Sequence, residues 1–78
     1  MDYELQLRIE QVSNVERVVD FFAGSAYEPA RLDDHTVELR PPDEISERLA
    51  RREIEIYLRV LERMHPGVGA SLVSEIES

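Results

Sequence analysis

The order in which strand-like and helix-like periodicities follow one another constrains this chain more than any other feature. Apolar and polar residues alternate over Tyr3–Ile9, which is the period-two pattern of a strand with one buried face. Val15–Phe22 carries apolar residues at helical spacing, and Asp43–Met64 keeps that spacing for about six turns. Three further strand-like stretches lie at Tyr27–Leu32, Thr36–Arg40 and Val68–Ile76.

Short signals mark the ends of the two predicted helices. Ser13 and Glu16 have the spacing of a capping box, so we expect the first helix to begin beside them. Gly24 follows that helix and is expected to end it in a left-handed conformation. Asp43, directly after two prolines, is expected to cap the start of the second helix.

The middle of the chain predicts a hairpin with one strand at a sheet edge. Asp33 and Asp34 supply turn chemistry between the two central strand-like stretches. Pro29 cannot donate a ladder hydrogen bond, so its strand belongs at an edge. In an alternative interpretation, Tyr27–Arg40 is one irregular loop, and the chain is two helices on a two-stranded ribbon, which is poorly stable alone.

The segment order is strand, helix, strand, strand, helix, strand. This order predicts an α+β fold of ferredoxin-like β-α-β-β-α-β topology, with a four-stranded antiparallel sheet and two helices on one face. We expect residues 1–78 to form a single small domain. Because this fold serves many unrelated functions, function has to be sought in particular sites.

Composition excludes several classes of function. The chain has no cysteine, so it has neither disulfides nor a thiolate metal site. Its net charge is −8 and all nine basic residues are arginine, a balance that opposes nucleic-acid binding and suits a cationic or neutral partner. No apolar run approaches the ~20 residues of a membrane helix, and the N-terminus lacks signal-peptide character. We therefore expect a cytoplasmic protein without a cofactor, a metal site or a membrane contact.

The second helix is more apolar than one sheet face requires. Its apolar residues spread over roughly 200° of the helix circumference, whereas a stripe of about 100° suffices to cover a sheet. We therefore expect Ile56, Tyr57, Val60 and Met64 to form an interface with another chain, either a second copy or a different protein. In the alternative interpretation, the first helix and the loops cover the excess.

Glu53 stands out on the same helix. Its neighbours three and four positions away are all apolar, and no arginine lies within helical reach. An ionised carboxylate is disfavoured in such surroundings unless another element supplies a partner. Glu53 is therefore a candidate ligand-binding or interface residue, against the simpler interpretation that its carboxylate reaches solvent at the edge of the stripe.

Other chemistry-bearing residues point to no catalytic site. His35 lies beside two aspartates, but this turn offers too few ligands for zinc or calcium. No serine has a linked base, so a monomeric nucleophilic site is not predicted. An enzyme remains an alternative only if Glu53 or His65 contributes to a site between subunits. The open sheet face lacks the stacking aromatic and basic side chains of RNA-recognition domains.

The order and length of the segments resemble an ACT domain, a regulatory module that commonly binds amino acids at a dimer interface. The resemblance covers the whole chain as topology. Where the family typically has a glycine between its first strand and first helix, this chain has Ser13-Asn14-Val15. We predict a non-catalytic protein-interaction or regulatory module that self-associates; the alternative is an ACT-like small-molecule sensor.

Overall fold

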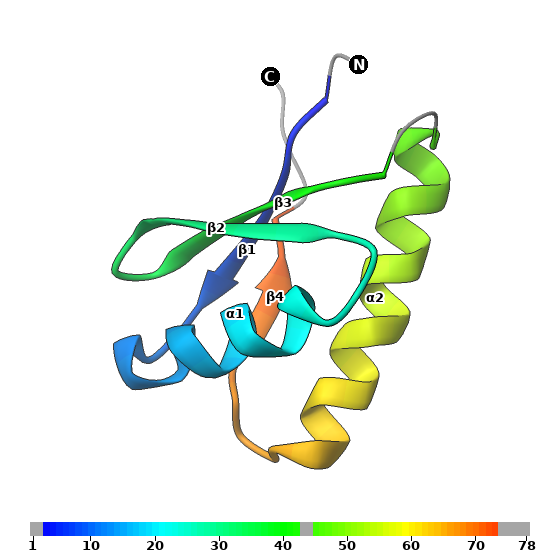
Figure 1. Ribbon diagram of the computed structural model, residues 1–78. Helices are drawn as coiled ribbons and strands as arrows, with labels where there is room; N and C mark the ends of the chain where they lie inside the picture. The colour runs from blue at the N-terminus through cyan, green and yellow to red at the C-terminus, as the bar shows by residue number, and fades with distance from the viewer. Residues whose placement is uncertain (1–2, 43–44, 74–78) are drawn as a thin grey trace.

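A four-stranded antiparallel sheet organises the chain. The computed structural model describes residues 3–42 and 45–73, and Figure 1 shows its helices and strands. The strands lie in the order β2-β3-β1-β4, so β1 and β3 are central and β2 and β4 are edges. Every pairing in the sheet is antiparallel. The strand bounds are β1 Leu5–Ile9, β2 Glu28–Asp33, β3 Thr36–Arg40 and β4 Ala70–Leu72.

Two α-helices complete this α+β fold. A 3-10 turn, Val12–Asn14, leads into α1, Val15–Ala23, and α2 spans Glu47–Met64. In Figure 1, α1 crosses in front of the strands and α2 runs along one side of them. The alternating residues of β1 and β3 share one buried cluster with residues of both helices, so one core lies between the sheet and the helices. Within the described ranges, no helix is both long and apolar enough to cross a membrane.

The predicted hairpin is confirmed, which rules out the irregular-loop alternative. β2 and β3 pair from Glu28↔Arg40 to Asp33↔Thr36, with a bulge between Arg31 and Asp33. Pro29 lies in the edge strand β2, as its missing N–H requires. Bulges and prolines at an edge discourage pairing with another chain, so this edge is not a docking surface for a further strand.

The start of α1 differs from the prediction. The capping box of Ser13 and Glu16 is not formed, because Ser13 lies inside the 3-10 turn and neither helix start has a side-chain cap. Asn14 instead uses its side chain at long range: Nδ2 donates to the Val68 carbonyl over 3.2 Å. This bond ties the start of α1 to the connection between α2 and β4.

The predicted end of α1 and the predicted start of α2 also differ from the structure. Gly24 has φ −90° and is not left-handed; the Ser25 hydroxyl satisfies the last turn by donating to the Phe22 carbonyl over 2.7 Å. α2 begins four residues later than expected, at Glu47, and its cap is Ser46, whose Oγ accepts from the Leu49 amide over 3.2 Å. The predicted cap, Asp43, lies outside the described residues.

The end of α2 follows the sequence signal. His65 is the C-terminal cap, and Gly67 and Gly69 in the following turn have φ of 85° and 69°. Only glycine adopts such values without strain, which explains two glycines in a three-residue span. β4 is shorter than the predicted Val68–Ile76 stretch, whose last residues lie outside the described range. Val68 itself is buried in the core.

Candidate functional site

The exposed side of α2 carries a row of large apolar side chains. Ile56, Val60 and Met64 were expected at an interface, and they are 53%, 43% and 58% exposed. Leu49 continues the row one turn from the start of the helix and is 47% exposed. With about 100° per residue, these four side chains lie within about 80° of one another around the helix. We call this set, Leu49, Ile56, Val60 and Met64, the apolar stripe.

The apolar stripe is separate from the face of α2 that builds the core. Ala50, Ile54 and Leu61 are buried and lie about 100° around the helix from the centre of the stripe. The sheet therefore covers only part of the apolar arc read from the sequence. Leu49 belongs to that arc, but only the position of the sheet decides that it stays exposed, so sequence reasoning did not place it at the interface.

Tyr57 lies between the stripe and the core. It is half-buried, and its ring makes edge-to-face contacts with Phe21, Phe22 and Tyr27, with centroid distances of 6.4, 5.9 and 6.1 Å. Such pairs contribute about 0.5–1.5 kcal/mol each beyond the area they bury. Tyr57 therefore joins α2 to α1 and to the residue before β2, and it forms the inner border of the stripe.

Glu53 has a partner that the sequence did not reveal. The Tyr27 hydroxyl donates to Glu53 Oε1 over 2.8 Å, from a residue 26 positions away. Tyr27 is only 1% exposed, whereas Glu53 is half-buried. Burial, followed by the hydrogen bond to Glu53 and its negative charge, raises the pKa of Tyr27 well above its usual range. Tyr27 thus stays protonated and holds the Glu53 carboxylate at the rim of the core.

An open cavity adjoins the C-terminal end of the stripe. Its volume is about 500 Å³, and it lies between α1 and the end of α2. Met64 and Phe21 give it an apolar wall, while its polar groups come from the remaining lining residues, Ser13, Glu16, Arg17, Asp20 and His65. The stripe therefore continues into a hollow with two acidic side chains on its α1 side.

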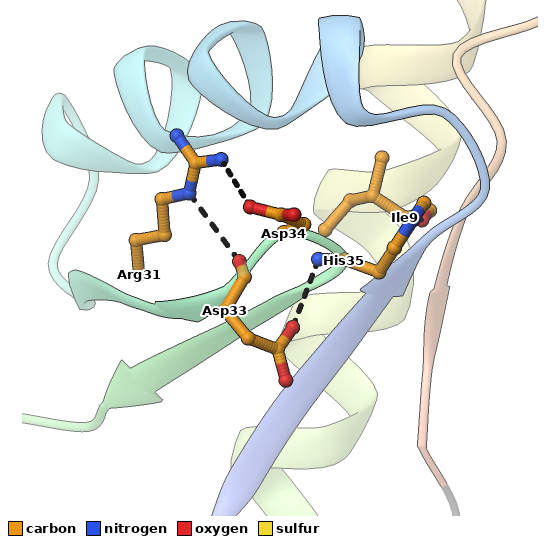
Figure 2. Close-up of polar contacts among 5 residues, drawn as sticks. All are labelled: Ile9, Arg31, Asp33, Asp34 and His35. Atoms are coloured by element: carbon orange, nitrogen blue, oxygen red, sulfur yellow. Dashed lines mark hydrogen bonds and ion pairs between the residues drawn. The ribbon is translucent and has the colours of Figure 1, made fainter.

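The β2–β3 turn holds a second polar cluster, which Figure 2 shows in detail. The His35 amide donates to Asp33 Oδ1 over 2.8 Å, and this bond, with further hydrogen bonds to Thr36, lowers the pKa of Asp33. His35 Nδ1 lies 2.8 Å from the Ile9 carbonyl, which can only accept, so Nδ1 carries the proton. Arg31 bridges to Asp34 over 3.3 Å. These bonds hold the turn onto β1.

The turn cluster does not form a metal centre in this structure. In the part of the chain that is described, no three histidine or acidic side chains are arranged to hold a metal ion. Asp33 and His35 bond to the backbone of their own turn and of β1, and Arg31 and Asp34 are exposed. The exposed apolar side of α2 is therefore the better candidate for function.

Arginines accompany the apolar stripe. Arg48, Arg52, Arg59 and Arg63 are exposed and lie along one flank of it, within about 60° of one another around the helix. We call these four residues the arginine row. Apolar side chains beside arginines are typical of protein interfaces, where arginine is enriched and lysine depleted. No protein-family model matches this chain, and no curated protein or solved structure is significantly similar to it.

Proposed function

We propose that this protein is a non-catalytic interaction module that self-associates through the apolar stripe of α2. The observation that carries the proposal is the exposure of Leu49, Ile56, Val60 and Met64, between 43% and 58%, on one side of a helix whose other side is fully used by the core. Large apolar side chains that cluster on one exposed surface mark interaction sites, whereas scattered ones do not.

The size of the chain supports the same proposal. A domain of 78 residues buries a small fraction of its apolar surface, and association with a second chain supplies additional burial. The net charge of −8 opposes association by simple repulsion, so a second copy has to be held by local contacts. The arginines of α2 reduce that repulsion next to the stripe.

We also propose that the topology is ferredoxin-like. What supports this is the order of the elements, in which each helix connects two strands that are parallel and separated by one antiparallel strand. In this arrangement α1 joins β1 to β2, and α2 joins β3 to β4. The fold itself assigns no function, so the proposal rests on the stripe.

The test compares two leucines of nearly equal exposure. Leu49 in the stripe is 47% exposed, and Leu32 in the edge strand β2 is 50% exposed. We expect the wild type to form a dimer whose mass rises with concentration in light scattering, and Leu49→Glu to weaken the dimer at least tenfold because it places a carboxylate in a dry contact. Leu32→Glu makes the same chemical change away from α2 and should leave the dimer intact.

The fold of the Leu49→Glu variant should not suffer. Position 49 is three residues after the cap Ser46, so a glutamate there completes a capping box and lies where the helix dipole favours an acid. Thermal unfolding at a concentration where both proteins are monomeric should therefore show an unchanged or slightly higher midpoint. A wild type that stays monomeric at high concentration, or a dimer equally sensitive to both substitutions, contradicts the proposal.

A second candidate function is sensing of a small molecule such as an amino acid. The observation in its favour is the cavity of about 500 Å³ at the connection from β1 to α1, lined by Ser13, Arg17 and Asp20, which offer groups for both charges of an amino acid. Free amino acids at millimolar concentration should then raise the unfolding midpoint. An Asp20→Asn variant should lose that shift, and no shift with any of the twenty amino acids contradicts this candidate.

A further inference from the structure

The two sides of the apolar stripe carry opposite charge. On one flank lies the arginine row, whose members are all exposed. On the other flank lies α1, where Glu16 and Asp20 line the cavity that Met64 and Phe21 also line. Arg17 and His65 lie in the same cavity; the Arg17 guanidinium donates to Asn14 Oδ1 over 3.3 Å. The surface is thus basic on one side of the stripe and on balance acidic on the other near the C-terminal end of α2.

This asymmetry distinguishes the ways in which two copies can pair on the stripe. When the twofold axis runs along α2, the two helices are parallel and the flanks exchange sides, so each arginine row faces the α1 of the other copy. When the axis runs across α2, the helices are antiparallel and each flank faces itself. In that arrangement arginines oppose arginines, and the acids of α1 oppose the same acids.

We propose that two copies of this chain associate with their α2 helices parallel. The apolar stripes are then in contact along the twofold axis, and Arg59 and Arg63 of each copy lie opposite Glu16 and Asp20 of the other. This inference rests on the proposed self-association and adds the orientation of the second copy. Opposite charges facing across an apolar contact favour this orientation, and like charges disfavour the antiparallel one.

Single cysteines read the orientation directly, because the chain has no cysteine of its own. In a parallel pair, position 49 of one copy lies next to position 49 of the other, and position 64 next to position 64. Positions 49 and 64 are about 22 Å apart along a helix, whereas a disulfide needs Cα atoms within about 7 Å. Leu49→Cys and Met64→Cys should therefore each form a covalent dimer with itself under mild oxidation.

A mixture of the two variants completes the experiment. With a mass tag on one of them, disulfides between position 49 and position 64 should be rare in a parallel dimer. Leu32→Cys, which has similar exposure away from α2, gives the background from random collision. The opposite pattern, mixed disulfides without self-pairing, overturns the parallel orientation but leaves self-association intact. A wild type that is monomeric in light scattering removes both.

Charge reversal gives an independent readout. Arg59→Glu with Arg63→Glu, and Glu16→Arg with Asp20→Arg, should each weaken the parallel dimer about tenfold or more, because each turns facing attraction into repulsion. The variant that carries all four changes should recover, since its reversed flanks again face each other with opposite charge. In an antiparallel dimer the flanks face themselves, so neither pair of changes should weaken association and there is no loss to recover; that result overturns the inference.

Discussion

Replacing Phe22 with alanine is expected to leave the protein largely unfolded at 37 °C. Phe22 is fully buried, and its ring contacts Phe21 edge-to-face at a centroid distance of 5.2 Å and Tyr57 at 5.9 Å. Truncation of a buried phenylalanine costs about 3–5 kcal/mol, because apolar contact is lost and a cavity remains. A domain of this size has roughly 4–12 kcal/mol of stability in total. Phe22 also supports Tyr57, so its loss should loosen α2.

Urea denaturation followed by circular dichroism measures this effect. Phe22→Leu keeps most of the side-chain volume and should cost less than half as much as Phe22→Ala. Phe21→Ala provides a matched control: the neighbouring residue of the same type is half-buried, so its truncation should be milder. A Phe22→Ala variant within about 1 kcal/mol of the wild type would show that the helices pack differently.

Above pH 10 the folded protein is expected to lose stability through Tyr27. The pKa of Tyr27 is raised by burial, by its hydrogen bond to Glu53 and by that residue's charge. A group whose pKa is higher in the folded state contributes its full stability below the unfolded value of ~10 and loses it as the pH rises. The loss approaches about 1.4 kcal/mol for each pH unit above 10. The chain has no lysine and no cysteine, so side-chain titration in this range comes from its three tyrosines.

The Tyr27→Phe variant should reverse in rank with pH. At pH 7 it lacks the 2.8 Å bond to Glu53 and should be less stable by about 1–2 kcal/mol, since water can reach the half-buried carboxylate and replace part of that bond. Toward pH 12 it should become the more stable protein, because it has no hydroxyl to ionise in the core. Urea midpoints across pH 7–12 would show the crossing. Tyr3, whose pKa burial also raises, is the second contributor, and Tyr3→Phe serves as the comparison. Parallel curves for wild type and Tyr27→Phe would contradict this account.

Periodicity in the sequence was sufficient to predict which segments form elements. The alternation in β1 places Leu5, Leu7 and Ile9 on the buried face and leaves Gln6 and Arg8 outside it. The same rule holds for Val37 and Leu39 in β3, and the bounds of that strand agree with the prediction. Both depend on local patterns that have only one way to bury their apolar side chains. Pro29 correctly placed β2 at an edge for an equally local reason.

Helix ends were harder to predict, because several residues compete to satisfy the same backbone groups. Ser13 and Glu16 have the right spacing for a capping box, but the 3-10 turn moves Ser13 into helical backbone. Asn14 is then engaged by the Val68 carbonyl, 54 residues away. At the other end of α1, the Ser25 hydroxyl satisfies the last turn and Gly24 needs no left-handed backbone. Tertiary contacts decided each case.

The candidate site divides in the same way. The sequence by itself determined that α2 has more apolar surface than one sheet can cover, because composition and helical period fix the width of its apolar arc. Only the tertiary structure decided which part of that arc is exposed, since this depends on the angle at which α2 meets the sheet and α1. That angle puts Leu49 in the stripe and turns Tyr57 toward the aromatic core. It also brings Tyr27 to Glu53, a pairing that no local pattern encodes because it depends on how two distant segments pack.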